Sequence, residues 1–234
     1  MLEQILEEGF RAYGLPLTGE MSGRFRKYCD ALLETNRVMN LTAIEGEDDT
    51  ARLHFLDCAA LLQYVGLSGK SLADIGTGAG FPGLVLKIAC PELRLTLIDS
   101  LDKRVGFLKS TCALLGLEDV TCLHARAEEI PAGLRESFDA ASSRAVARLN
   151  VLAELCLPYV RPGGVFLAMK GPEIEEELEE AKPAIKRLGG KTEAVHKYTV
   201  GGTDIVHSVL VIRKIAPTPI GLPRKWAQIK KRPL

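Results

Sequence analysis

Apolar residues in the first 65 positions recur at the spacing of amphipathic helices. Two groups share this three- and four-residue repeat: Phe25, Tyr28, Leu32 and Leu33, and then Leu53, Leu56, Ala60 and Leu61. The segment NLTAI (40–44) separates them and is typical of an asparagine-led turn. No stretch here alternates as a strand would. The pattern therefore predicts an all-helical N-terminal extension over residues 1–65.

From residue 71 the pattern changes to short apolar runs that alternate with helical segments. The runs predict strands at 71–75, 93–99, 120–125, 138–142, 165–170, 192–200 and 207–214. Helices are predicted between them, at 81–89, 103–115, 150–160 and 173–188. Strands that alternate with helices indicate a parallel sheet with helices on both faces.

The last two predicted strands are joined by a short loop around GGTD, which is too short for a crossover, so they must pair antiparallel. A parallel sheet that ends in an antiparallel hairpin is typical of Rossmann-like methyltransferases, whereas a dinucleotide dehydrogenase keeps its last strand parallel. We expect an α/β fold of the class I methyltransferase type, with a mostly parallel seven-stranded sheet and an antiparallel last strand. It would occupy residues 66–216, and residues 217–234 would form a basic tail.

Composition is that of an ordinary soluble protein, with 47% apolar and 26% charged residues. No apolar run approaches the ~20 residues that a membrane span requires, and the acidic, amphipathic N-terminus does not resemble a signal peptide. The six cysteines form no CxxC pair and lie among apolar residues. They indicate buried thiols in a reducing compartment. We therefore expect a cytoplasmic protein without a metal site or a membrane partner.

Charge is balanced overall, with 30 basic and 30 acidic residues, and so gives no general support for nucleic-acid binding. Its distribution is uneven. The segment 173–180 is strongly acidic, and no acidic residue follows Asp204, whereas several basic ones do. Such a basic end could contact phosphates, although judged alone it would more often be a solvated terminus.

The segment DIGTGAGFPGL (74–84) is the strongest local signal, because it follows a strand and opens a helix. Its glycines allow a tight turn and a close approach of backbone to a ligand. Asp74 suits the cationic amino-acid part of S-adenosylmethionine, and Asp99, at the end of the next strand, can accept hydrogen bonds from two ribose hydroxyls. The predicted cofactor residues here are Asp74, Gly76, Thr77, Gly78, Gly80, Phe81 and Asp99.

Two other interpretations of this motif remain. The glycines could simply form a tight turn, with Asp99 capping the next helix. Alternatively, the motif could bind NAD, but NAD sites favour GxGxxG and need a helix N-terminus that is open to pyrophosphate. Here the third glycine comes one residue early, and Phe81-Pro82 crowd the start of the helix. These features favour S-adenosylmethionine.

Two later strands also end in candidate site residues. ARAEE (125–129) follows the third strand, where Ala127 and Glu128 would lie beside adenine, although a simple helix-entry turn explains the segment equally well. SSRAVA (142–147) follows the fourth strand, where methyl donor and acceptor should meet, because ligands bind at the carboxyl ends of parallel strands. Arg144 would contact the reactants there, or else act as a surface salt-bridge partner.

Taken together, these segments resemble the family that methylates a guanine N7 of small-subunit ribosomal RNA, known as RsmG or GidB. The matching segments run through nearly the whole chain: NLTAI (40–44), HFLD (54–57), DIGTGAGFPGL (74–84), LIDSLDKRVGFL (97–108), RAEE (126–129), SRAVA (143–147), LPYVRPGG (157–164) and the PRK and KKRPL parts of the tail (223–234). The glycine motif is shared by many methyltransferases, whereas its combination with the other segments is much more specific.

The resemblance implies roles for further residues. It implies that Asp99, the 76–80 loop, Ala127 and Glu128 hold the cofactor, and that Asn40, His54, Lys103, Arg126, Arg144 and Lys170 line the methyl-transfer pocket or the RNA-facing side. We expect His54, Arg144 and Lys170 to be catalytic, with Arg144 also near the cofactor. The predicted RNA contacts are Asn40, Lys103, Arg104, Arg126, Arg224, Lys225, Lys230 and Lys231.

Some of these residues have simpler explanations. A lone helical histidine such as His54 is more often structural, and the tail departs from the family pattern at Trp226, where glycine is usual after PRK. Trp226 could stack on a base or pack on the domain. Lys103 and Arg104 at a helix start run against the dipole preference, which favours a functional reason for them.

The expected activity is transfer of a methyl group from S-adenosylmethionine to N7 of a guanine in 16S rRNA. N7 has a lone pair and no proton, so no general base is needed, and Arg144 and Lys170 would contact O6 or phosphate. We expect a monomer that acts on 16S rRNA or the small subunit. The alternatives are a methyltransferase for a small molecule or protein, and a non-catalytic protein that binds S-adenosylmethionine.

Overall fold

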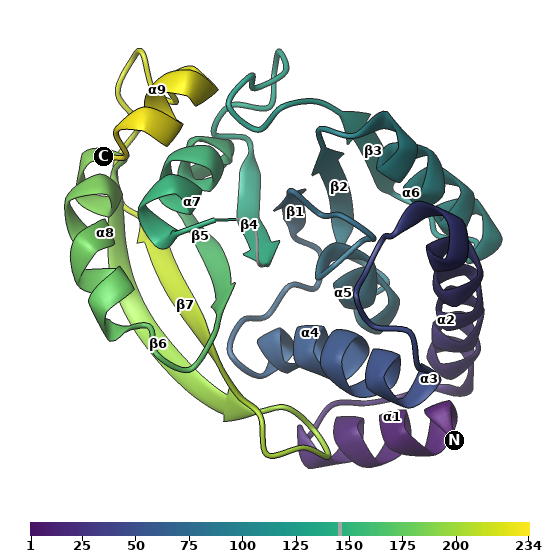
Figure 1. Ribbon diagram of the computed structural model, residues 1–234. Helices are drawn as coiled ribbons and strands as arrows, with labels where there is room; N and C mark the ends of the chain where they lie inside the picture. The colour runs from purple at the N-terminus through teal and green to yellow at the C-terminus, as the bar shows by residue number, and fades with distance from the viewer. Residues whose placement is uncertain (145–146) are drawn as a thin grey trace.

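Seven strands form one sheet in the computed structural model of the protein, which describes residues 1–144 and 147–234 (Figure 1). The strands are β1 (Ser71–Ile75), β2 (Arg94–Asp99), β3 (Val120–His124), β4 (Phe138–Arg144), β5 (Val160–Lys170), β6 (Gly190–Thr199) and β7 (Val206–Lys214). Their order is β3-β2-β1-β4-β5-β7-β6. The neighbouring strands among β1 to β5 pair parallel, and β7 pairs antiparallel with both β5 and β6. The predicted Rossmann-like sheet is confirmed.

The order in which strands are added to the sheet reverses at β1, which lies between β2 and β4. From β1 the chain first adds β2 and β3 on one side, and then crosses over to add β4 and β5 on the other. The carboxyl ends of β1, β2, β3 and β4 therefore meet at one edge. In open α/β sheets this switch point is where ligands bind.

Successive strand residues alternate between two hydrophobic cores, because side chains along a strand point to opposite faces. Leu72 belongs to one core and its neighbour Ala73 to the other, and Leu167 and Ala168 divide in the same way. The first core is covered by α5 (Gly83–Ala89) and α6 (Asp102–Leu114), and the second by α7 (Leu149–Cys156) and α8 (Glu175–Arg187). Both faces of the sheet are thus buried, as expected for parallel strands.

The N-terminal extension is helical, as predicted, and it shares the first core with the sheet. It comprises α1 (Leu2–Ala12), α2 (Gly19–Met39), α3 (Glu47–Asp49), the π-helix η1 (Thr50–Leu56), α4 (Asp57–Ala59) and the 3₁₀ turn η2 (Ala60–Gln63). Phe10 and Phe25 are fully buried in the same cluster as Leu72 and Leu97. Residue 65 therefore marks a change of secondary structure inside one continuous core.

The C-terminal segment 217–234 is folded against the second core. Its helix α9 (Trp226–Lys231) lies beside α7, where Ile229 and Leu222 are buried (Figure 1). Arg135 donates hydrogen bonds to the carbonyl oxygens of Leu222 and Thr218, at 2.6 and 3.0 Å. The sequence indicated only a basic tail here, because a single buried isoleucine among charged residues does not produce a helical pattern.

Among the residues that the structure describes, no helix has both the length and the apolar character needed to cross a membrane. The same residues contain no cluster of three or more His, Cys, Asp or Glu side chains that could hold a metal ion. All six cysteines carry free thiols.

Candidate active site

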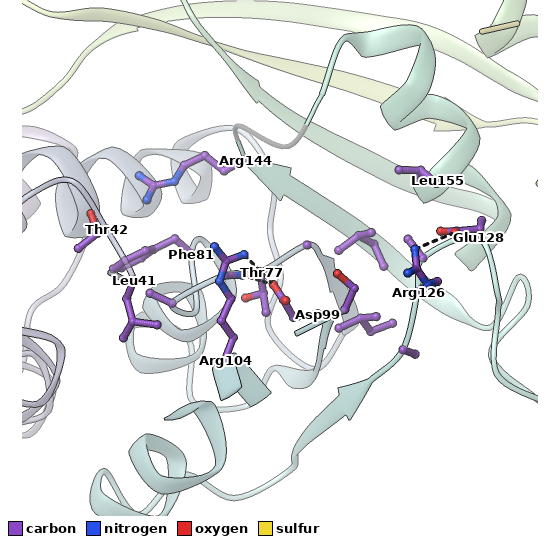
Figure 2. A pocket seen from close by; sticks show the side chains of 18 of the residues that line it. Leu41, Thr42, Thr77, Phe81, Asp99, Arg104, Arg126, Glu128, Arg144 and Leu155 are labelled. Atoms are coloured by element: carbon purple, nitrogen blue, oxygen red, sulfur yellow. Dashed lines mark hydrogen bonds and ion pairs between the residues drawn. The ribbon is translucent and has the colours of Figure 1, made fainter. Parts of the chain in front are cut away.

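A cavity of about 580 Å³ lies at the carboxyl ends of β1, β2, β3 and β4 (Figure 2). Figure 2 shows Asp99 near its middle, Arg126 and Glu128 at one end, and Thr42, Phe81 and Arg144 at the other. The wall also includes His54, Gly76, Thr77, Gly78, Arg104, Ala127 and Trp226. The fold thus brings most of the predicted site residues into one cavity.

The loop after β1 presents its backbone to this cavity. Gly76 and Gly78 have positive φ angles of 68° and 61°, a conformation that favours glycine. A Cβ atom at Gly78 would meet no atom within 4 Å and would project into open space. The Gly78 N–H donates to Oδ2 of Asp99 at 2.9 Å, and the Leu101 N–H donates to Oδ1 at 2.9 Å. The Asp99 carboxylate, only 3% exposed, is therefore held in a fixed position on the cavity wall.

Gly80 and Asp74 support this loop on the side that faces away from the cavity. A Cβ atom at Gly80 would lie 2.7 Å from the Tyr28 hydroxyl, which donates to the Ala79 carbonyl at 2.6 Å. Asp74 is fully buried and accepts hydrogen bonds from the Gly83 N–H (2.9 Å) and the Ser142 hydroxyl (2.8 Å). Burial raises the pKa of Asp74. Among the described residues neither Asp74 nor Gly80 lines the cavity, so their position suits a supporting role better than the predicted contact with a ligand.

The end of the cavity near β3 carries the residues predicted to lie beside adenine. Ala127 and Glu128 are both on the wall. The Ala127 carbonyl accepts a hydrogen bond from the Tyr159 hydroxyl at 3.0 Å, which fixes the backbone there. The Nη1 atom of Arg126 lies 3.9 Å from Oε1 of Glu128, at this end of the cavity (Figure 2).

At the opposite end, Arg144 is held by several partners at once. Its Nη1 donates to Oδ2 of Asp57 at 3.1 Å and to the Leu53 carbonyl at 3.0 Å, and its Nη2 donates to Nδ1 of His54 at 2.8 Å. The guanidinium also lies over the Phe81 ring, 4.8 Å from its centroid. Arg144 therefore holds several residues of the cavity wall in place and is not a surface salt-bridge partner.

His54 is packed against the same aromatic ring. It belongs to η1, and π-helical segments are frequent at functional sites. Its imidazole stacks on Phe81 with ring centroids 4.2 Å apart, and its Nε2 lies 2.8 Å from Oγ1 of Thr42. Burial, together with the positive charge of Arg144, lowers the pKa of His54 to about 3. The ring is therefore neutral at neutral pH.

Asp57 belongs to the same hydrogen-bonded group as Arg144 and His54. It was not among the predicted site residues, although it is the last residue of the HFLD segment. Its Oδ1 accepts from the Tyr198 hydroxyl and from Nδ1 of His207, each at 2.7 Å. Burial opposes its ionisation, but the hydrogen bond from His207 and the charge of Arg144 outweigh burial and lower the pKa of Asp57. The carboxylate three residues after His54 was the signal that could have identified it.

Seven other predicted residues are not among the described residues of the cavity wall, three of them in the main body of the protein and four in the C-terminal segment. Lys170 donates from Nζ to the Ala147 carbonyl and to Oε1 of Glu177, both at 2.6 Å, and so supports the chain that follows β4. Asn40 ends α2 in the left-handed conformation, with φ 50°, and Lys103 is exposed on the first turn of α6. Residues 145–146 of the predicted SSRAVA segment lie outside the described residues.

The basic residues of the C-terminal segment have different surroundings. Arg224 donates to Oε1 and Oε2 of the fully buried Glu154, at 2.8 and 2.5 Å. Its guanidinium therefore anchors the segment, and its contact with RNA stays a prediction. Lys225, Lys230 and Lys231 are exposed, and Trp226 lies on the cavity wall with 38% of its surface exposed.

Residues 21–206 match the model of the GidB family, described as rRNA small subunit methyltransferase G. The chain belongs to the GidB family. Two GidB relatives named ribosomal RNA small subunit methyltransferase G are similar over their whole length. The protein of Alkaliphilus oremlandii is 48% identical over 237 residues, with 100% of this chain and 99% of the relative covered. That of Alkaliphilus metalliredigens is 46% identical over 235 residues, with 99% and 98% covered.

A solved structure agrees with the fold of this GidB chain. TYW2 of M. jannaschii, crystallised in complex with AdoMet, superposes with a TM-score of 0.55 over 68% of this chain and 75% of its own. Its sequence is only 14% identical, so the similarity concerns the fold alone. The chain is thus a methyltransferase of the GidB family with a Rossmann-like sheet.

Proposed function

We propose that this protein transfers a methyl group from S-adenosyl-L-methionine to N7 of a guanine in the 16S rRNA of the small ribosomal subunit, in the cytoplasm. One observation carries the proposal. In a chain of the GidB family, one cavity contains the fixed Asp99 carboxylate and the open backbone of Gly78 at one part of its wall. It contains the neutral His54 and the positively charged Arg144, hydrogen-bonded to each other, at another.

The residues of the cavity fit S-adenosylmethionine. Asp99 keeps lone pairs for two ribose hydroxyls, and the open space beside Gly78 admits a ligand close to the backbone. Ala127 and Glu128 would flank adenine at the β3 end. When bound, the cofactor supplies an electrophilic methyl group on a sulfonium. Asp74 would act indirectly, by joining the end of β1 to Gly83 at the start of α5.

The residues near Arg144 are suited to positioning and not to proton abstraction. Guanine N7 carries an in-plane lone pair and no proton, so the chain has only to orient the base and match its changing charge. His54 is neutral, and its Nδ1 lone pair is already occupied by Arg144. Neither residue is arranged to remove a proton. Lys170 would act from a distance, by holding Ala147.

RNA would reach the cavity along its basic rim. Arg104 and Arg126 border the cavity, and Lys103, Lys225, Lys230 and Lys231 are exposed. Such cations contact phosphates and supply affinity with little sequence preference. The target guanine must be unpaired or flipped out, because N7 within an A-form helix faces a deep and narrow groove. Free 16S rRNA and the assembled subunit both remain candidate substrates.

Transfer of labelled methyl groups tests this proposal. The purified protein is incubated with labelled S-adenosylmethionine and with 16S rRNA, small subunits, transfer RNA or total protein. We expect label in 16S rRNA, free or assembled, and background levels elsewhere. Label in protein or a small molecule alone would favour the first alternative function. Calorimetric binding of the cofactor without transfer to any acceptor would favour a non-catalytic binding protein.

A further inference from the structure

The hydroxyl group of Thr42 is the end of a chain of hydrogen bonds that starts at Asp57. Asp57 accepts from Arg144, Arg144 donates to Nδ1 of His54, and Nε2 of His54 lies 2.8 Å from Oγ1 of Thr42. The Ile44 N–H donates to the same oxygen at 3.1 Å. Thr42 lines the cavity at the end where Phe81 and Arg144 lie (Figure 2).

The direction of each hydrogen bond in this chain follows from Arg144. A guanidinium has only donors and stays protonated, so Nδ1 of His54 must be the acceptor. A neutral imidazole then carries its hydrogen on Nε2, which must donate to Thr42. The low pKa of His54 agrees with this neutral tautomer. Thr42 Oγ1 therefore accepts two hydrogen bonds, one from His54 and one from Ile44.

The backbone of Thr42 is fixed as well. The Asn36 side chain accepts from the Thr42 N–H and donates to the Thr42 carbonyl, both at 2.9 Å. A hydroxyl oxygen has two lone pairs, and here both are in use, so the hydroxyl can act toward a ligand only as a donor. Within the described part of the chain no acceptor takes its hydrogen.

We propose that Thr42 is a positioning residue whose hydroxyl donates a hydrogen bond to an acceptor oxygen of a reactant bound in the cavity. Arg144 fixes the tautomer of His54, and His54 in turn leaves the Thr42 hydroxyl able only to donate. This inference rests on the proposed function. Two oxygens have the required chemistry, O6 of the target guanine and the carboxylate of the cofactor. A hydroxyl with free lone pairs could also accept from an amino group, whereas Thr42 cannot. It would thus favour guanine, which presents O6 where adenine presents N6–H₂.

Substitution of Thr42 by valine and by serine tests this inference. Valine has the same shape without the hydroxyl, and serine restores the hydroxyl. We would measure single-turnover methyl transfer to RNA at saturating cofactor, and also the affinities for S-adenosylhomocysteine and for methylthioadenosine, which lacks the amino-acid part. We expect Thr42→Val to lose about ten-fold or more in one of these quantities, and Thr42→Ser to remain near the parent.

The pattern of losses identifies the oxygen. If O6 is the acceptor, the transfer rate falls and both ligand affinities stay unchanged. Replacing the target guanine by 2-aminopurine, which keeps N7 and lacks O6, then slows the parent more than it slows Thr42→Val. The altered reactivity of N7 acts on both proteins, whereas the lost hydrogen bond acts on the parent alone. If the carboxylate is the acceptor, affinity falls for S-adenosylhomocysteine and not for methylthioadenosine.

Other outcomes overturn the inference. Equal losses of affinity for both ligands, or a serine variant as damaged as the valine variant, would reduce Thr42 to a structural residue. An unchanged rate together with unchanged affinities would remove it from recognition. An inactive parent protein, in contrast, would count against the proposed function, and the two ligand affinities would still decide whether Thr42 recognises the carboxylate.

Discussion

Nη2 of Arg144 donates a hydrogen bond to Nδ1 of His54 over 2.8 Å, and this contact places a permanent positive charge beside the imidazole. Burial and this charge lower the pKa of His54 to about 3, from an ordinary value of 6.5. His54 therefore takes up a proton only well below neutral pH. His54 would be the most obvious general base of the cavity, but its low pKa makes it a weak one. This agrees with a methyl acceptor, such as guanine N7, that has no proton to lose.

The first prediction concerns pH. Because His54 does not titrate in the neutral range and guanine N7 needs no deprotonation, the single-turnover rate should be nearly flat across that range. His54→Ala should lower the rate by disturbing Arg144 and Thr42, without changing the shape of the profile. Rates are measured at saturating cofactor and RNA. A steep rising limb in the parent that disappears in His54→Ala would identify His54 as a general base and remove the guanine-N7 assignment.

The second prediction concerns the cofactor. Asp99→Ala should weaken binding of S-adenosylmethionine by about ten- to a hundred-fold, because a charged hydrogen-bond partner is worth roughly 1.5–3 kcal/mol. Asp102→Ala is the matched control, since Asp102 begins α6 nearby and its side chain is 85% exposed. Calorimetry compares the two variants with the parent. Equal affinities in a folded Asp99→Ala protein would place the ribose elsewhere.

The third prediction separates the basic residues of the C-terminal segment. Replacing Lys225, Lys230 and Lys231 together by alanine should lower the slope of log K against log salt for RNA binding by roughly 2–3. Arg224→Ala should instead lower the melting temperature, because it leaves the buried Glu154 without its partner, at a cost of up to roughly 3 kcal/mol. An unchanged salt slope in the triple variant would make these lysines solvated surface residues.

The fourth prediction uses the single tryptophan of the chain as a probe. Trp226 lies on the wall of the cavity together with Ala127 and Glu128, so a bound adenosine should alter its environment. We expect the intrinsic tryptophan fluorescence to change during titration with S-adenosylhomocysteine and to give the calorimetric affinity. Trp226→Phe should abolish the signal and weaken binding by only a few-fold. A constant fluorescence during binding that calorimetry detects would show that Trp226 does not adjoin the cofactor.

Much of the fold could be predicted because buried parallel strands appear in sequence as short apolar runs between helical repeats. The glycine loop and Asp99 were recognisable for a related reason, since residues at the ends of neighbouring strands converge on one edge. The short β5 extension from residue 160 was missed because proline and glycine occupy positions 162–164. The helix α9 was missed because a single buried isoleucine gives no helical pattern.

The roles of single charged residues could not be predicted in the same way. Arg224 and Glu154 are separated by 70 positions in the chain, so nothing local shows that the arginine is neutralised. Lys170 is similarly committed to Glu177 and Ala147. Thr42 is an inconspicuous residue type, and only its contact with His54 reveals it. Asp57 lies close to His54 in sequence, but its role becomes clear only from its contact with Arg144. Partners distant in sequence decide whether a charge faces a ligand or holds the protein together.

The identity of the methylated atom tests the central claim most directly. 16S rRNA or small subunits that lack the modification are treated with the protein and labelled S-adenosylmethionine, the RNA is digested to nucleosides, and the labelled product is identified by mass spectrometry. Oligonucleotide mapping then locates it. We predict a single labelled nucleoside, 7-methylguanosine, at one position of 16S rRNA. Label on an exocyclic amine, a ribose hydroxyl or a base other than guanine would contradict the account.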